Sequence, residues 1–440
     1  MAELIKNYMN FLDTGKTERR CVDEIIRQAS EAGFKNIDDV KTLKAGDKVW
    51  VNKMGKSVVL FEIGTDPIEN GMNILGGHID SPRLDIKQNP LYERDGIVYL
   101  NTHYYGGIKK YQWLTLPLAL YGVVFKADGS KVDIAIGDDP EDPVFSISDI
   151  LPHIDQARMQ KPAADFVDAE NLDLVLGAYP VNPEEKEAGK KKVLAFLKEK
   201  YGIEEEDFIS AELEVVPAGK ARFCGFNQTL ILSYGQDDRI CSYTSFAAML
   251  ETRAGKRTNC GIFADKEEIG SAGATGMNSH LLDNAVAEVV ARLGQYSELT
   301  VRRALCNSWM LSSDVNSAYD PLPPNNLLYD KQNSSFLSRG VVFNKYTGSR
   351  GKSGASDANA EFISKVRNQL NAKGVTFQTA EMAKVGVGGG GTIAHYCAEY
   401  GMSVLDCGVP ILSMHAPWEI ASTFDIEQAF EAYKAFLQLA

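Results

Sequence analysis

The 440-residue sequence has no C-x-x-C pair, no uninterrupted run of 18 apolar residues, no G-x-S-x-G motif and no Walker A motif. The first absence, with an odd count of seven cysteines, argues against a zinc ribbon or a disulfide framework. The second argues against a membrane span. Without a G-x-S-x-G motif or a Walker A motif, the sequence gives no support for serine-hydrolase or phosphoryl-transfer chemistry. Because the first 30 residues are charged throughout and lack the apolar core of a signal peptide, we expect a cytoplasmic protein.

Positive charge is also scarce. The net charge is −13 and the sequence pI is about 5.1. The short basic run KEAGKKK at 186–192 is typical of a solvated helix face. We therefore expect no nucleic-acid partner. The length allows two domains, or one catalytic domain that carries a large insertion.

Hydrophobic spacing predicts such an insertion. Helical spacing in residues 1–33 gives way to strand-like runs ending in MNILGGHID, and strands alternate with helices again after about Phe226. Between them lie polar and aromatic strands and one Lys/Glu-rich exposed helix within 182–203. We predict an α/β fold whose sheet carries helices on both faces. Its catalytic domain is discontinuous, 1–86 and 227–440, and the inserted domain is 87–226.

Histidines and carboxylates follow several of the predicted strands. They are His78 and Asp80 in NILGGHIDSPRLD, Asp237 in LSYGQDDR, Glu267 and Glu268 in GIFADKEEIGSAGATG, Asp314 in SSDVNSAYD, and His415 in ILSMHAP. Sites in open α/β sheets gather beyond the carboxyl ends of strands. A mixed nitrogen and oxygen set suits Zn²⁺, Co²⁺ or Mn²⁺. Adjacent glutamates allow one to bind metal while the other moves protons, so the set predicts a metallohydrolase.

Each residue alone has a plainer explanation. His78 and Asp80 are two apart, so on a strand they share a face, and Asp80 can fix the tautomer of a metal-binding ring. The same pair can be an ordinary polar strand end. Asp237 and Asp238 can simply cap a helix that opens near Ile240. The conjunction of all these residues at strand ends favours the metal site.

The glycine run GVGGGG at 386–391 offers a competing interpretation. It fits G-x-G-x-x-G, precedes the helix-like TIAHYCAEYG, and has Asp406 20 residues beyond Gly386. This pattern is typical of a dinucleotide site. Only a short strand candidate precedes the run, and a nucleotide site leaves the histidines and carboxylates unexplained. A glycine-rich turn can equally present amides to a peptide carbonyl.

Five segments in order, GGHIDSPRLDIK, SYGQDDR, DKEEIGS, SSDVNSAYDP and ILSMHAPWE, resemble the motif series of the aspartyl aminopeptidase family of cocatalytic metallopeptidases. The resemblance covers nearly the whole chain. It implies a zinc-peptidase-like mixed sheet with an inserted β-rich dimerisation domain. It also implies a homo-oligomer, a tetrahedral dodecamer built from dimers.

The resemblance further implies five ligands for two divalent ions, most readily zinc, with cobalt or manganese as alternatives. His78 and Asp314 would bind one ion, Glu268 and His415 the other, and Asp237 would bridge them. Asp237 is chosen over its neighbour because the related bridging aspartate precedes an Asp or Asn to which a cis peptide often joins it.

The remaining roles concern protons and substrate. By resemblance Glu267 is the general base, and the family preference for N-terminal Asp or Glu requires a cation in the specificity pocket. Lys345 stands where a comparable lysine occurs, with Arg350 and Lys352 as alternatives. His153 in DILPHID resembles a histidine that reaches a neighbouring subunit's active site, or it is a surface-loop histidine.

Three functions are compared on these grounds. The first is a two-metal aminopeptidase acting on peptides. The second is a related di-metal amidohydrolase, a deacylase or carboxypeptidase, which acetylation of the peptide N-terminus would distinguish. The third is a non-catalytic assembly protein with a vestigial site, against which the retention of Glu267 and all five ligands argues.

Overall fold

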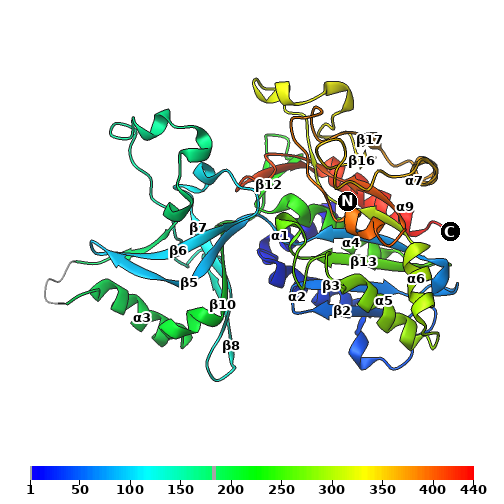
Figure 1. Cartoon of the computed structure of the whole chain (residues 1–440), viewed down its shortest axis with the longest axis horizontal. Coiled ribbons are helices and arrows are strands. Elements are labelled where there is room, and N and C mark those ends of the chain that lie inside the picture. Colours follow the sequence, from blue (N-terminus) through cyan, green and yellow to red (C-terminus); the bar gives the residue numbers. More distant parts are fainter. Residues whose placement is uncertain (1, 181–184) are drawn as a thin grey trace. The chain divides into compact units, whose positions relative to one another are not determined.

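The structure, a computed structural model, describes residues 2–180 and 185–440. Its contacts divide the chain into two compact units (Figure 1). The core unit comprises Met1–Ser81, Ala221–Met414 and Glu419–Ala440, and the insert unit comprises Pro82–Lys220 and His415–Trp418. The predicted inserted domain, 87–226, overlaps the insert unit, and its role in dimerisation stays a prediction.

The core unit contains a mixed nine-stranded sheet. In spatial order its strands are β1 (Lys35–Asn36), β2 (Lys48–Lys53), β3 (Ser57–Glu62), β13 (Thr258–Ala264), β4 (Met72–His78), β14 (Trp309–Ser312), β18 (Ser403–Gly408), β16 (Val341–Asn344) and β17 (Phe377–Thr379). The central strand β4 is parallel to β13 and β14, and every residue of β4 and β13 is buried. The carboxyl ends of these three strands therefore meet at one edge.

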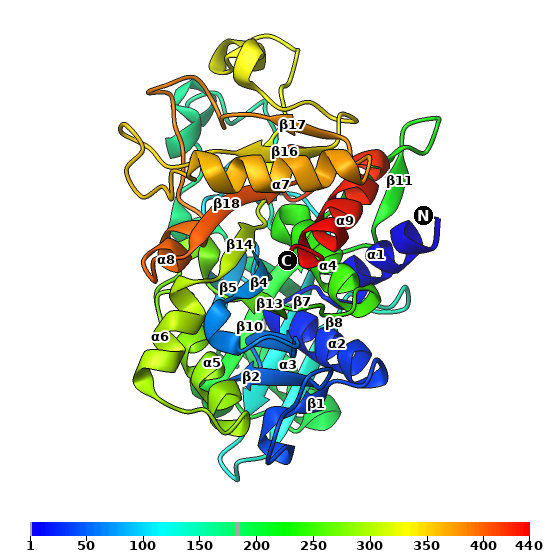
Figure 2. The ribbon, with the colours of Figure 1, turned by 90° about the vertical axis from the view of Figure 1, so that its right-hand side faces the viewer.

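Alternating side chains build a core on each face of this sheet. Leu75 and Phe263 join one apolar cluster, and their neighbours Ile74 and Ile262 join another. The first cluster includes α1 (Ala2–Thr14), α2 (Glu18–Glu31), α4 (Gln236–Glu251), α7 (Ala360–Ala372) and α9 (Thr423–Leu437). The second includes α5 (Leu281–Arg292), α6 (Glu298–Cys306) and α8 (Ala394–Ala398). Figure 2 shows α5 and α6 on one side of the strands and α1 and α2 on the other, which confirms the predicted fold class.

A second sheet of the core unit was not foreseen. Its strands, in spatial order, are β11 (Arg222–Cys224), β12 (Leu230–Ser233), β20 (Glu419–Ser422), β19 (Pro410–Leu412) and β15 (Asn316–Ser317). Asp237 follows β12, whereas His78 ends β4, and Glu267 and Asp314 follow other strands of the nine-stranded sheet. The predicted strand ends therefore belong to two sheets, because strand-like periodicity says nothing about which strands pair.

The insert unit is β-rich, as predicted. Its six strands form an antiparallel sheet in the order β8 (Lys131–Ile136), β7 (Leu118–Phe125), β10 (Ala211–Pro217), β5 (Arg83–Arg94), β6 (Ile97–Tyr105) and β9 (Leu174–Ala178). The predicted charged helix is α3 (Ala188–Tyr201), which shares an apolar cluster with the sheet. Residues 182–184 of that predicted stretch lie outside the described residues.

Local predictions failed in the second half of the core unit. The helix-like TIAHYCAEYG contains only the five-residue α8, and neither α6 nor β16 was predicted. In the part of the chain that the structure describes, no helix combines the length and apolarity that crossing a membrane requires.

Candidate metal centre

His78 is the centre of the site. It is the last residue of β4, lies beside Ala264 of β13, and is 1% exposed. Its Nε2 atom is 3.3 Å from Asp237 Oδ1, 3.8 Å from Glu267 Oε2 and 4.0 Å from Asp314 Oδ2. Three carboxylates from distant parts of the sequence therefore face one imidazole nitrogen.

The spacing of these atoms fits a metal ion. Ligand atoms of His78, Asp237 and Asp314 all lie within 4.8 Å of one another. Tetrahedral zinc ligands with bonds of about 2.1 Å stand roughly 3.4 Å apart, so small shifts would bring this group to coordination distance. A carboxylate oxygen of Glu268 lies within 4.8 Å of one from Asp237. Within the core unit the structure thus brings together the four predicted ligands that belong to it.

Asp237 is placed by its backbone rather than by a regular helix. Gly235 adopts φ 71° as the chain leaves β12, and Asp237 keeps non-helical angles in the first turn of α4. Its peptide bond to Asp238 is cis, the arrangement that the resemblance implies. Ser81 Oγ donates to the Asp237 carbonyl at 2.6 Å. The Asp237 side chain faces His78, with Oδ1 3.3 Å from Nε2 of the ring.

Asp80 connects the imidazole to the paired glutamates. His78 Nδ1 lies 3.1 Å from the Asp80 carbonyl oxygen and 3.2 Å from Asp80 Oδ1, so the ring faces the carboxylate as the sequence predicted. The same carboxylate accepts hydrogen bonds from the amides of Glu267 and Glu268, each at 3.2 Å. The glutamates occupy a one-turn 3-10 helix, η8 (Glu267–Ile269). Asp80 therefore orients both the ring and the glutamate turn, and the second contact was not predicted.

The electrostatics of the cluster favour a cation. Burial raises the pKa of Asp314 well above its usual value, and the nearby Glu267 carboxylate adds to the shift. Burial alone would lower the pKa of His78, but Asp237, Asp80 and Glu267 raise it well above the ordinary value. Gathering carboxylates around one ring is unfavourable unless positive charge offsets them. The donor set therefore fits a divalent ion.

Sequence reasoning missed Glu419. This carboxylate is 1% exposed at the start of β20, and its Oε2 accepts from the Asp237 amide at 3.0 Å. The backbone carbonyl of Glu419 accepts from Gln236 Nε2 at 2.7 Å. The sequence offered one sign of its importance, because Glu419 is the acidic residue in the largely apolar segment ILSMHAPWEIAS. Its partner, 182 residues away, could not be deduced from spacing.

His415 and His153 both belong to the insert unit. His415 follows β19, and its Nδ1 lies 2.9 Å from the Gly107 carbonyl oxygen. His153 is exposed in the segment between β8 and β9. The ligand role of His415 and the substrate role of His153 stay predictions.

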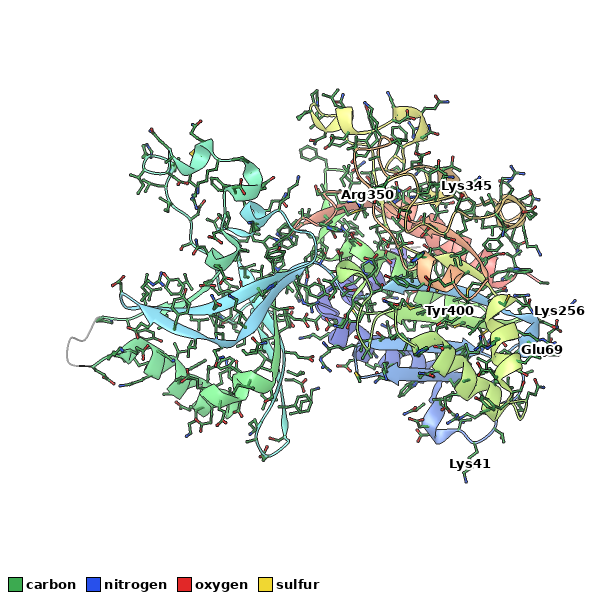
Figure 3. The ribbon with its side chains drawn as sticks, in the orientation of Figure 1. Lys41, Glu69, Lys256, Lys345, Arg350 and Tyr400 are labelled. Carbon is green, nitrogen blue, oxygen red and sulfur yellow. The ribbon has the colours of Figure 1, made fainter. Side chains whose placement is uncertain are left out.

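The predicted specificity cations lie after β16. Lys345 and Arg350 are exposed, and Figure 3 marks both. Lys352 pairs with Asp357 at 3.3 Å and lies over the Tyr346 ring at 3.9 Å. Lys352 is therefore already engaged, which leaves Lys345 and Arg350 as the better candidates for an acidic substrate side chain.

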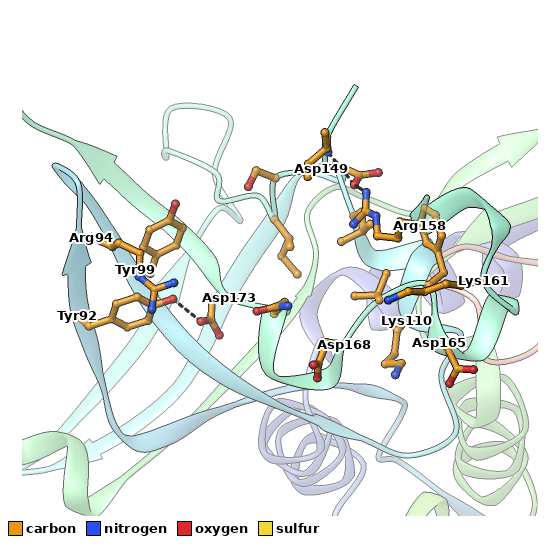
Figure 4. Close-up of a pocket in the computed structure, with 17 residues that line it drawn as sticks. Tyr92, Arg94, Tyr99, Lys110, Asp149, Arg158, Lys161, Asp165, Asp168 and Asp173 are labelled. Atoms are coloured by element: carbon orange, nitrogen blue, oxygen red, sulfur yellow. Dashed lines mark hydrogen bonds and ion pairs between the residues drawn. The ribbon is translucent and has the colours of Figure 1, made fainter. Parts of the chain in front are cut away.

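A polar cavity of about 710 Å³ lies within the insert unit (Figure 4). Two of its carboxylates already have side-chain partners: Asp173 accepts from Tyr92 and Asn101, and Asp149 pairs with Arg158. The residues that line it include no histidine or cysteine. Cavity size therefore does not identify the reactive site here, whereas the chemistry of the His78 cluster does.

Comparison with known proteins gives a consistent result. A family model described as aminopeptidase I zinc metalloprotease (M18) matches residues 11–437. A Clostridium acetobutylicum protein named probable M18 family aminopeptidase 1 is 54% identical over 435 residues, covering 98% of this chain and 93% of that protein. The crystal structure of an M18-family aminopeptidase from Thermotoga maritima superposes with a TM-score of 0.95 at 44% identity, covering 99% and 96% of the two chains. The mApe1 dodecamer of S. cerevisiae shares the fold at 18% identity and a TM-score of 0.79, with 98% and 95% coverage.

Proposed function

Because the chain belongs to the M18 family of zinc aminopeptidases, we propose that it uses two metal ions to release the N-terminal residue of peptides. The observation that carries the proposal is the convergence of Asp237, Glu267 and Asp314 on His78 Nε2. Family membership favours this activity over a deacylase or a carboxypeptidase. A peptide with a free amino terminus should be cleaved, and its acetylated counterpart should not.

The proposed ligands divide between two ions. His78 and Asp314 would hold one, Glu268 and His415 would hold the other, and Asp237 would contribute to both. When bound, such ions acidify water and polarise the scissile carbonyl. Glu267 lies next to the ligands without being one of them, so it can accept a proton from the attacking water and return it to the leaving amine.

Paired substitutions test these roles. Glu267→Gln removes the proton acceptor but keeps the shape, so turnover should fall by about 10²–10⁴-fold with normal zinc content. Glu268→Gln should lower zinc occupancy. Elemental analysis after reconstitution and rates on one peptide give both readouts. Zinc loss in the Glu267 variant alone would reverse the two assignments, and normal turnover in it would reject the base.

We further propose a preference for N-terminal Asp or Glu, with Lys345 as the recognising cation. A charge-assisted hydrogen bond is worth about 1.5–3 kcal/mol, or roughly 10- to 150-fold in specificity. Lys345→Met should reduce the Glu-to-Leu ratio of kcat/KM by that factor. Lys352→Met is the matched control, because Lys352 already pairs with Asp357. An unchanged ratio in the Lys345 variant would remove acidic specificity and keep the aminopeptidase.

A homo-oligomeric, cytoplasmic enzyme is also proposed. The dodecameric relative and the usual closed symmetry of homo-oligomers support assembly. Seven cysteines, an odd number without a C-x-x-C pair, suit a reducing compartment. Light scattering should give a mass far above 48.3 kDa. If His153 acts on a neighbouring site, His153→Ala chains mixed with Glu267→Gln chains should recover partial activity. A fully active monomer would contradict both ideas.

A further inference from the structure

A nucleotide site does not account for the structure of residues 392–400, which follow the glycine run. A dinucleotide fingerprint needs a strand, a glycine turn and a full helix. Here the run ends in α8, which has only five residues. Ile393 and Ala394 are nevertheless buried in the core unit, so the segment is firmly packed. It packs against strands of the nine-stranded sheet that lead to the metal centre.

Two contacts attach this segment to strands that lead into the site. A Cβ placed on Gly76 would lie 3.2 Å from Ile393 Cδ1, so Ile393 packs against β4 two residues before His78. Thr392 Oγ1 donates to Asp406 Oδ1 at 2.6 Å. Asp406 in β18 is the register partner of Ser312, which precedes the ligand-bearing loop after β14. The segment therefore contacts β4, which ends at His78, and β18, which pairs with the strand before Asp314.

Tyr396 extends from this anchored segment to the glutamate turn. Its hydroxyl donates to the Gly270 carbonyl at 2.8 Å. Gly270 closes η8, with φ 85° and an amide that donates to the Glu267 carbonyl at 2.8 Å. Burial and the nearby Glu267 carboxylate raise the pKa of Tyr396, which keeps its hydroxyl protonated as a donor.

We propose that Tyr396 is a positioning residue for Glu267, holding the carbonyl end of the glutamate turn while Asp80 holds its amide end. The proposal rests on the assignment of Glu267 as general base. With both ends fixed, the Glu267 carboxylate keeps one position relative to His78. Misplacing a reacting group by about 1 Å can cost roughly 100-fold in rate, so a single hydrogen bond at this turn is consequential.

Tyr400 provides a matched control. It lies just after α8, packs partly buried against the same apolar cluster, and its nearest named carboxylate is that of Asp283 in α5 rather than one of the glutamate turn. Figure 3 marks its position. Tyr396→Phe and Tyr400→Phe each remove one hydroxyl from the same segment. A purely structural role would give the two variants similar kinetics.

The kinetic test compares kcat and KM of the zinc-loaded variants. Tyr396→Phe should lower kcat roughly 2- to 10-fold with KM and zinc content close to wild type, whereas Tyr400→Phe should leave kcat unchanged. In a Glu267→Asp background, where the carboxylate is already withdrawn by one methylene, Tyr396→Phe should have little further effect. Equal kcat in the two tyrosine variants, a change in KM alone, or full additivity with Glu267→Asp would overturn the proposal.

Hydrogen exchange tests the same contact without catalysis. In Tyr396→Phe the peptide that spans residues 266–273 should exchange faster than in wild type, and in Tyr400→Phe it should not. If wild-type protein is inactive but Tyr396→Phe still speeds exchange in residues 266–273, the peptidase function is rejected and the Tyr396–Gly270 contact is retained. If residues 266–273 exchange at the wild-type rate in Tyr396→Phe, the proposed role of the Tyr396 hydroxyl is rejected even if the enzyme is active.

Discussion

At the scale of single residues, Asp80 explains why two distant motifs behave as one site. Its two carboxylate oxygens accept from the amides of Glu267 and Glu268, while Oδ1 also lies beside the His78 ring. An amide side chain offers only one acceptor oxygen, so in Asp80→Asn an NH₂ group would face one of these N–H groups. Sequence reasoning found the ring contact because it is local.

Asp80→Asn should therefore lower zinc affinity or turnover by roughly 10- to 100-fold, the usual effect of losing a group that orients ligands. Isothermal titration with zinc and steady-state rates measure the two effects. Asp47→Asn, which alters an exposed turn contact to the Lys44 amide, is the control. Wild-type affinity and rate in the Asp80 variant would show that the two amide contacts do not matter.

Asp406 predicts a pH-dependent contribution to stability. Burial raises its pKa to about 6, partly opposed by the hydrogen bond from Thr392. A raised folded-state pKa gives stability that is fully present below the unfolded pKa of about 3.9 and is lost as pH rises through about 6.

From pH 5 to pH 7, the unfolding free energy of metal-free wild type should therefore fall by about 1 kcal/mol relative to Asp406→Asn, which does not titrate. Urea unfolding at several pH values provides the measurement. Using metal-free protein avoids the separate pH dependence of zinc binding. A difference that stays constant with pH would show that Asp406 does not titrate in this range.

At the scale of elements, the close approach of β18 to the loop after β14 places Asp314. A Cβ on Gly408 would lie 1.7 Å from the Asp314 carbonyl oxygen, so only glycine fits. Gly408→Ala should displace that backbone, cost about 1–3 kcal/mol of stability, and weaken zinc binding. Gly255→Ala is the control because its Cβ would meet nothing within 4 Å. Thermal unfolding and zinc titration give the comparison, and equal effects of the two substitutions would contradict it.

Elements with strong periodicity were predictable from sequence. The apolar runs of β4 and β13 and the helices α1 and α2 appear where expected. The short β16 and the nine-residue α6 were missed because few residues carry their pattern. The division into two sheets was also missed, since the pairing of β12 with β20 joins residues nearly 190 positions apart.

At the scale of the whole molecule, the order of five motifs identified the family, whereas assembly depends on contacts between chains that motif order does not describe. His78, Asp237, Asp314 and Glu268 converge without a partner chain. The fold of one chain therefore gathers these four proposed ligands. The number of metal ions that an active chain binds tests the proposed mechanism most directly.

The most direct test is a zinc titration of metal-free enzyme, measuring release of the N-terminal residue from a peptide with a free amino terminus. The account predicts that activity rises until two ions are bound per chain and then remains constant. Glu267→Gln should bind the same two ions and release almost nothing. Full activity with one ion per chain, or without any, would contradict the two-metal aminopeptidase.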